Sequence, residues 1–254
     1  MFTQENSGAR PAFETASGPH LEAAAPARAG CPARPEPDSP LWDALAPRGF
    51  HARHGRRVLA CGLALASLLP AACLSLPIAL VTAWEHGPAH VLFRQERVGW
   101  RGRSFRMLKF RTLRAGEDDT PADARASRFG RFLRRTHLDE LPQLVNVLRG
   151  EMDLVGPRPE TLAIDAWARA HVPGFYLRNV VRPGLSGLAQ VTQGYAEPEV
   201  SAYEEKLRLD RRYLERPTLA ADVALLARTL AWVLRARGAQ AWPRGTLRPQ
   251  ARRR

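Results

Sequence analysis

The sequence predicts a mainly α-helical protein with one small β-hairpin and one segment that enters a membrane. Three observations support this fold class. Residues 58–84 carry no charge, apolar residues recur at helical spacing in the second half of the chain, and two short strand-like runs flank a turn that contains glycine. The 254 residues divide into a tail at 1–55, a membrane segment at 56–86, a compact domain at 87–237 and a basic C-terminal tail at 238–254.

Residues 1–55 are predicted to form a disordered tail. They are rich in alanine, proline, glycine and polar residues, and they lack the periodic apolar surface that offsets the entropy lost on ordering a chain. A short anchor around Leu41 and Trp42 interrupts this composition. We therefore expect the part before about Leu41 to be dispensable for chemistry.

The net charge of +13 comes almost entirely from arginine, since Lys109 and Lys206 are the only lysines. A basic chain indicates an anionic partner, which could be a nucleic acid, a phosphorylated substrate or an anionic lipid. Composition does not choose among these. The three cysteines, Cys31, Cys61 and Cys73, form no Cys-x-x-Cys pair, so the sequence gives no support for a zinc site or a redox motif.

The uncharged run at 58–84 is long enough to cross a bilayer as a helix, and it is too long and too far into the chain for a signal peptide. Pro70 lies near its centre, where a proline removes a backbone hydrogen bond at a cost of roughly 3 kcal/mol. Arginines flank the run on both sides, although a spanning helix normally has one basic flank. These features fit a helix that turns back at Pro70 and a kinked spanning helix about equally.

The soluble part begins with strand-like runs at 91–112 around a Gly-containing turn, which predict a basic hairpin, and with an acidic loop at 115–124. A helix is predicted from Ser127 as its N-cap. A second helix is predicted with Asp139 as its N-cap and Gly150 at its end. The apolar positions of this second helix recur at i, i+3, i+4 and i+7, and they are Leu141, Leu144, Val145 and Leu148.

Two turns rich in proline and glycine follow, at 155–159 and 182–187. A last helix is predicted from an apolar stripe made of Leu219, Val223, Leu226, Leu230 and Val233. Such a stripe either packs in a core or lies on a membrane surface, and a core position is the commoner of the two.

Asp139 and Glu140 are adjacent carboxylates at a predicted helix start, where the helix dipole favours ionised acids and bound phosphate. Such a pair can hold a metal–diphosphate and attack phosphorus, but it is also ordinary capping chemistry, and we expect neither residue to be deeply buried. Arg134 and Arg158 either bind phosphates through paired hydrogen bonds or form a solvated face. His137 either transfers protons or is a surface histidine.

Four motifs occur in order along the chain: FRQERVG at 93–99, KFRT at 109–112, LDELPQLVNVLRGEMDLVGPRP at 138–159 and RPGLSGLAQV at 182–191. Together they resemble the signature of the bacterial sugar transferases, which are monotopic polyprenyl-phosphate phosphoglycosyl transferases. The resemblance covers roughly residues 56–235. It is specific, because one of the four ordered motifs is more than twenty residues long.

The resemblance implies a re-entrant membrane helix broken at a proline, here Pro70 by position. This helix joins a compact and mostly helical cytoplasmic catalytic domain with interfacial helices. It therefore favours re-entry of the membrane segment over a kinked spanning helix. It also implies that the chain lies in the bacterial inner membrane, with the catalytic domain on the cytoplasmic face.

The resemblance further implies that Asp139 attacks the β-phosphate of a UDP-sugar, releases UMP and carries a phosphosugar, which polyprenyl (undecaprenyl) phosphate then attacks. Glu140 matches the residue that supports Mg²⁺. The implied substrate-binding residues are all basic, namely Lys109, Arg111, Arg134, Arg158 and Arg182. The product of such a reaction starts the assembly of a cell-surface glycan. The motifs do not specify the sugar or the oligomeric state.

Two residues depart from the family pattern. His137 stands where many members have a small hydroxyl residue, and Asp153 stands where serine is common. Two other functions are compatible with the sequence. One is a non-enzymatic membrane-surface module in which Asp139 is only a cap. The other is a nucleic-acid binder, against which the apolar run and the lack of a nucleic-acid motif weigh. Magnesium-dependent release of UMP from a UDP-sugar separates the enzyme from both.

Overall fold

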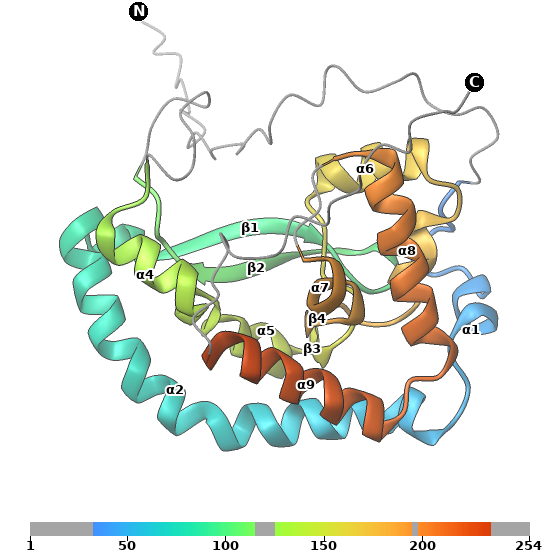
Figure 1. Cartoon of the computed structure of the whole chain (residues 1–254), viewed down its shortest axis with the longest axis horizontal. Coiled ribbons are helices and arrows are strands. Elements are labelled where there is room, and N and C mark those ends of the chain that lie inside the picture. Colours follow the sequence, from blue (N-terminus) through green and yellow to red (C-terminus); the bar gives the residue numbers. More distant parts are fainter. Residues whose placement is uncertain (1–32, 115–124, 195–197, 235–254) are drawn as a thin grey trace, which may run out of the picture.

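The computed structural model describes residues 33–114, 125–194 and 198–234. These residues form a mainly helical body with two small sheets, partly enclosed by one long curved helix (Figure 1). The helices and strands are α1 (Leu41–Leu45), α2 (Arg56–His86), β1 (Leu92–Val98), β2 (Ser104–Phe110), α4 (Arg128–Thr136), α5 (Gln143–Arg149), β3 (Asp153–Val155), α6 (Leu162–His171), β4 (Gly184–Ser186), α7 (Leu188–Gln193), α8 (Val200–Glu215) and α9 (Leu219–Leu234). The loop predicted at 115–124 and the C-terminal tail predicted at 238–254 lie outside the described residues.

The membrane segment forms α2, which remains one helix across Pro70 and Pro77. In Figure 1 it follows one edge of the body and then curves up its side. The predicted break at Pro70 is therefore wrong, because the helix bends without being interrupted there. The helical stretch His51–His86 has a mean hydropathy of 2.1 in its most apolar window, and only 11% of that window is buried. It is thus long and apolar enough to cross a membrane, and the described residues leave most of its surface uncovered.

The segment before α2 does not match the predicted disordered tail over its described part. Residues 33–55 contain α1 and the π-helical turn η2 (His51–Gly55), and the Trp42 side chain is only 1% exposed. The Trp42 ring meets Tyr176 edge-on, with 6.2 Å between ring centroids. The anchor predicted around Leu41 and Trp42 is therefore confirmed, whereas disorder is wrong for residues 33–55. Residues 1–32 lie outside the described part.

The predicted hairpin and the predicted helix from Ser127 are both confirmed. Strands β1 and β2 pair antiparallel, with Leu92 opposite Phe110 and Val98 opposite Ser104. The N-cap of α4 is Ser127, whose hydroxyl accepts a 2.8 Å hydrogen bond from the Gly130 backbone N–H.

The second predicted helix differs from its prediction at the start. Residues Leu138–Glu140 form a separate 3-10 turn, η5, and α5 begins after Pro142. Asp139 therefore caps no helix, and its predicted capping role is wrong. Gly150 ends α5 as predicted, in the left-handed region at φ 82°.

A second sheet forms where the sequence predicts only turns. Strands β3 and β4 pair in parallel, with Asp153 opposite Gly184 and Val155 opposite Ser186. The backbones of these two segments approach so closely that a Cβ atom on Gly184 would lie 2.1 Å from the Gly156 backbone nitrogen. Glycine is therefore required at this position by the close approach of two backbones.

Three residues of the apolar stripe of α9 face away from the body, whereas Leu226 is partly buried and packs against the main apolar cluster, so the predicted core position is wrong for only part of the stripe. Leu219, Val223 and Leu230 are 53%, 51% and 59% exposed, whereas Asp222 and Leu225 face the body and are buried. Helix α9 thus presents exposed apolar side chains that no described residue covers, as α2 does. Of the two alternatives for this stripe, the structure favours the membrane-surface helix.

Candidate active site

The two adjacent carboxylates lie between α4 and α5, in the short turn η5. His137 adopts a left-handed conformation (φ 57°) that ends α4 and redirects the chain into η5. Asp139 and Glu140 are each only 7% exposed, so the expectation that neither is deeply buried is wrong. Two neighbouring acids are therefore held in a site largely shielded from water, where local charges act strongly.

Glu140 is held by two cations. Its Oε1 accepts a 2.8 Å hydrogen bond from Lys109 Nζ and a 2.6 Å hydrogen bond from Arg158 Nη2. Burial disfavours the ionised carboxylate, but the charges and hydrogen bonds of Arg158 and Lys109 outweigh it and hold the pKa of Glu140 well below its usual range. Glu140 is thus a fixed anion at neutral pH.

Asp139 differs from Glu140 in its contacts and in the direction of its pKa shift. Its carboxylate accepts no side-chain hydrogen bond from the residues that the structure describes. Burial raises the pKa of the Asp139 carboxyl to about 6, opposed by the charge of Lys109 and assisted by the nearby Glu140 carboxylate. At neutral pH this carboxylate is mostly ionised and desolvated, and no side chain in the described part of the chain pairs with it directly, which are the properties of an activated nucleophile.

Three of the five predicted basic residues face this pair. Lys109 comes from β2, Arg134 from α4 and Arg158 from the turn after β3, and the charge of each lowers the pKa of Asp139. The Nη1 atom of Arg134 is buried and has no hydrogen-bond partner among the described residues. Three elements thus surround two carboxylates with cationic groups suited to phosphate oxygens.

Arg111 and Arg182 lie elsewhere. The Arg111 Nε atom donates to the His90 carbonyl at 3.2 Å, at the start of the hairpin. Arg182 donates to the Gly150 carbonyl at 2.9 Å, and its guanidinium lies over the Trp100 ring, 4.6 Å from the centroid. The structure therefore brings neither of them into contact with Asp139 or Glu140.

Sequence reasoning missed Asn146, which positions Lys109. Its Oδ1 accepts from the Leu108 N–H at 3.0 Å, and its Nδ2 donates to the Arg106 carbonyl at 2.8 Å. These bonds join α5 to the open edge of β2, next to the lysine that contacts Glu140. A buried asparagine within a run of apolar residues was the available signal, because such a group must find partners.

Asp153, which departs from the family pattern, belongs to a separate cluster at the start of α2. Its Oδ2 lies 3.8 Å from Arg56 Nη2, and its Oδ1 lies 3.7 Å from Arg57 Nη1. Burial raises the pKa of Asp153 against the opposing charges of Arg56 and Arg182. Arg57 also donates to the Val147 carbonyl at 2.5 Å. This cluster ties α2 to the body rather than forming part of the candidate site.

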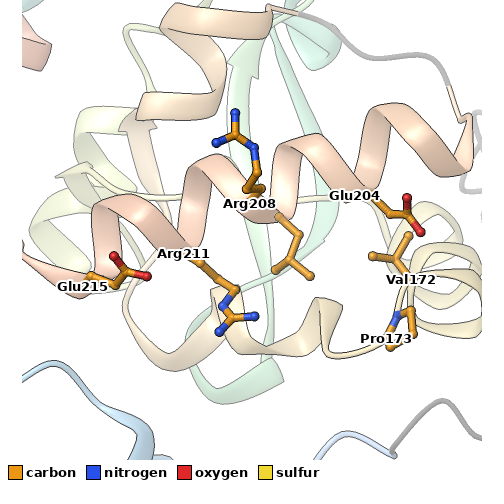
Figure 2. Close-up of a pocket in the computed structure, with 7 residues that line it drawn as sticks. Val172, Pro173, Glu204, Arg208, Arg211 and Glu215 are labelled. Carbon is orange, nitrogen blue, oxygen red and sulfur yellow. The ribbon is translucent and has the colours of Figure 1, made fainter.

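A shallow pocket of about 330 Å³ lies on another face, along α8. Figure 2 shows the charged side chains of this helix spread along it, with Val172 and Pro173 beside the end that carries Glu204. Its lining residues are Val172, Pro173, Glu204, Leu207, Arg208, Arg211 and Glu215. None of them belongs to the group around Asp139.

The acidic groups suit a metal that is shared with a substrate. Within the described ranges, no group of three or more His, Cys, Asp or Glu side chains could hold a metal ion. Mg²⁺ is commonly bound by one or two carboxylates together with substrate phosphates and water. Glu140 fits such a role, because its Oε2 makes only a 3.4 Å contact with Arg158 and keeps lone pairs available.

Comparison with known proteins identifies the family. A model of the bacterial sugar transferase family matches residues 51–236. The chain belongs to the bacterial sugar transferase family. The match includes α2, the hairpin and the candidate site, whereas α1 precedes it.

Several known proteins are similar in sequence to a large part of this bacterial sugar transferase. A UDP-glucose:undecaprenyl-phosphate glucose-1-phosphate transferase of Caulobacter vibrioides is 41% identical over 175 residues, covering 66% of this chain and 64% of the relative. One with the same name from Xanthomonas campestris is 39% identical over 155 residues, covering 58% and 32%. The exopolysaccharide production protein ExoY of Rhizobium meliloti is 35% identical over 217 residues, covering 77% and 91%. The first two matches thus span between a third and two thirds of the relatives' length.

Proposed function

We propose that this bacterial sugar transferase moves a sugar 1-phosphate from a UDP-sugar to undecaprenyl phosphate, and so starts the assembly of a cell-surface glycan. The observation that carries the proposal is the buried Asp139 carboxylate, which accepts no side-chain hydrogen bond from the described residues although the charges of three cationic side chains act on it. Two relatives are named as transferases of this kind, and a third is named for exopolysaccharide production. Both kinds of name are consistent with this reaction.

In the proposed reaction an Asp139 oxygen attacks the β-phosphorus of the UDP-sugar. The bond from this phosphorus to the bridging oxygen breaks, UMP leaves with that oxygen, and an aspartyl phosphosugar forms. An oxygen of undecaprenyl phosphate then attacks the same phosphorus, which yields the lipid diphosphate sugar and restores the Asp139 carboxylate. Covalent capture divides the exchange into two displacement steps.

The cationic residues act on the developing negative charge. Arg134 has a buried nitrogen available for a phosphate oxygen, and Arg158 and Lys109 hold Glu140 in place. Mg²⁺, when bound through Glu140, would neutralise part of the diphosphate charge. The low exposure of the site limits access of water, which would otherwise hydrolyse an acyl phosphate.

The function is tested by measuring UMP release from a panel of UDP-sugars by purified protein with undecaprenyl phosphate. We expect release with at least one UDP-sugar and its loss after chelation of Mg²⁺. Absence of UMP with every sugar, by folded and membrane-inserted protein, would favour a non-enzymatic membrane module instead.

The pH dependence of the first step should report Asp139. Its pKa of about 6 predicts that kcat/KM for UMP release falls about tenfold per pH unit below pH 6, because the protonated carboxyl is not a nucleophile. Since this folded-state pKa is raised, ionisation lowers the free energy of unfolding as pH rises from about 4 to 6. A pH–rate profile that stays flat down to pH 4.5 would contradict this assignment.

Membrane re-entry is part of the proposal and rests on how α2 is attached. At its start, Arg57 donates to the Val147 carbonyl at 2.5 Å and to the Leu148 carbonyl at 3.1 Å. At its end, Glu85 accepts a 2.8 Å hydrogen bond from Ser127, the N-cap of α4. Both ends therefore contact one compact body, which is hard to reconcile with ends on opposite sides of a hydrocarbon layer about 30 Å thick.

Single cysteines at exposed positions on the two sides of α2 test the topology. In a chain whose native cysteines are replaced by serine, Arg48→Cys and Glu96→Cys are both expected to react with a membrane-impermeant thiol reagent from the cytoplasmic side only. Both residues are exposed in the structure. Labelling from opposite sides would mean that α2 spans the membrane.

A further inference from the structure

A buried cluster of four charged residues lies beside the turn that carries Arg158. Arg178 comes from the 3-10 segment η6 (Phe175–Val180), Lys206 and Asp210 come from α8, and Glu160 follows the turn. Arg178 Nε donates to Asp210 Oδ2 at 2.9 Å, and its Nη1 donates to Glu160 Oε1 at 3.3 Å. Lys206 also contacts Glu160. Two cations and two anions thus neutralise one another away from water.

Arg178 reaches beyond this cluster to the candidate active site. Its Nη2 donates to the backbone carbonyl of Arg158 at 2.8 Å. The side chain of the same Arg158 donates to Glu140 at 2.6 Å. One buried guanidinium, 2% exposed, therefore holds the backbone of Arg158, whose own guanidinium holds Glu140.

The same turn is also held from the hairpin. Arg97 Nη1 donates to the Pro159 carbonyl at 3.0 Å, and the Val98 N–H donates to the Glu160 carbonyl at 2.9 Å. Pro157 and Pro159 restrict φ on either side of Arg158. These contacts hold the residues on either side of Arg158, and Arg178 holds Arg158 itself through its carbonyl, together with the Glu160 carboxylate.

Stability alone does not account for such a cluster. Moving charged groups out of water costs several kcal/mol each, and well-packed apolar residues of similar volume often stabilise a protein at least as well. What a guanidinium supplies and an apolar side chain cannot is a set of directed hydrogen bonds from one rigid plane. Arg178 uses this set on Asp210, Glu160 and the Arg158 carbonyl at once.

We propose that Arg178 is a positioning residue for the transfer reaction, and that it acts through Arg158. This role rests on the proposed function, because it concerns the placement of a group beside the reacting phosphate. Displacement of Arg158 by about an ångström would misplace Glu140 and the phosphate oxygens together, and such errors can cost about a hundredfold in rate.

A double-mutant cycle tests the proposal in the full-length protein. Arg178→Lys keeps the charge but cannot reproduce the three directed contacts, and it is expected to lower kcat for UMP release by about a hundredfold, with a smaller change in KM. In an Arg158→Lys background the same change should have less than about a threefold effect, because the residue it positions is already lost. Additive effects would overturn the proposal.

Two further variants separate positioning from stability. Glu160→Gln keeps an acceptor for Arg178 and serves if Arg178→Lys does not fold, and it should show the same non-additivity with Arg158→Lys. Asp222→Asn weakens another buried network, in which Tyr213 donates to Asp222 at 2.6 Å, so it should lower the melting temperature but combine additively with Arg158→Lys. Non-additivity in this control would mean that general loosening explains the result.

A readout that needs no turnover distinguishes this proposal from the proposed function. In protein labelled with isotopes at arginine, the NMR signal of the Arg158 guanidinium is identified by its loss in Arg158→Lys. The chemical shift of this signal is expected to change in Arg178→Lys. An unchanged signal would overturn the positioning role. If the wild-type protein releases no UMP while the Arg158 signal still shifts in Arg178→Lys, only the proposed function is contradicted.

Discussion

Replacing Asp139 by asparagine is expected to abolish the covalent phosphosugar adduct and to lower UMP release by at least about a thousandfold, because the nucleophilic oxyanion is removed. Intact-protein mass after incubation with an accepted UDP-sugar measures this directly. Wild-type protein should gain one sugar-phosphate, and hydroxylamine should remove it, as it does from an acyl phosphate. An adduct that persists in folded Asp139→Asn would place the nucleophile elsewhere, with Glu140 as the next candidate.

The same variant should not destabilise the protein. Asp139 caps no helix, so no capping hydrogen bond is lost. Burial raises the pKa of the Asp139 carboxyl to about 6, so the ionised carboxylate opposes folding at pH 7, and neutral asparagine removes that cost. Asp139→Asn should therefore melt at or above the wild-type temperature at pH 7 while being inactive.

Asp165→Asn is the matched control for this experiment. Asp165 is also buried, but it pairs with Arg169 at 2.8 Å on α6 and contacts neither Asp139 nor Glu140. This variant should lose stability and keep the adduct. The opposite signs of the two stability changes distinguish a group held for chemistry from one held for structure.

The parts of the fold that the sequence predicted are those fixed by local rules. Ser127 caps α4 and Gly150 ends α5, because each requirement involves only a few neighbouring residues. The hairpin formed as predicted for the same reason. The identity of the acidic pair came from the resemblance, since two adjacent acids at a helix start are by themselves ordinary.

The buried face of α5 was not predictable from its apolar spacing. Val145 of the predicted stripe is 37% exposed, whereas Gln143 and Asn146 are completely buried. The open edge of β2 lies against Asn146 and requires hydrogen-bonding partners, which leucine and valine cannot supply, whereas the buried Gln143 amide has no hydrogen-bond partner among the described residues. The contact with β2 buries Asn146, and the apolar spacing of the helix alone does not indicate it.

The stripe of α9 illustrates a different limit. Apolar periodicity shows that one face avoids water, but it does not say whether protein or lipid covers that face. The exposed Leu219, Val223 and Leu230 resolve this point only once the fold is known. The raised pKa of Asp139 has the same origin, because burial produced by three separate elements cannot be read from the residues next to it.

Replacing Trp42 by alanine is expected to lower the free energy of unfolding by about 3–5 kcal/mol, the usual cost of removing a buried aromatic side chain. Trp42 is only 1% exposed and packs in the main apolar cluster together with Ala60 and Ala64 of α2. Its indole N–H donates to the Glu36 carbonyl at 2.8 Å, so the segment before α1 is also fastened through it. Thermal unfolding followed by circular dichroism in detergent would show the loss.

Leu41→Ala is the control for this last prediction, because Leu41 belongs to the same short helix but is 56% exposed. It should change the free energy of unfolding by less than about 1 kcal/mol. Below its lowered melting temperature, Trp42→Ala should still form the phosphosugar adduct, since Trp42 contacts Tyr176 of η6 and none of the residues around Asp139. Equal and small effects of the two variants would mean that the segment before α2 contributes little to the fold, as the composition of the N-terminal tail first indicated.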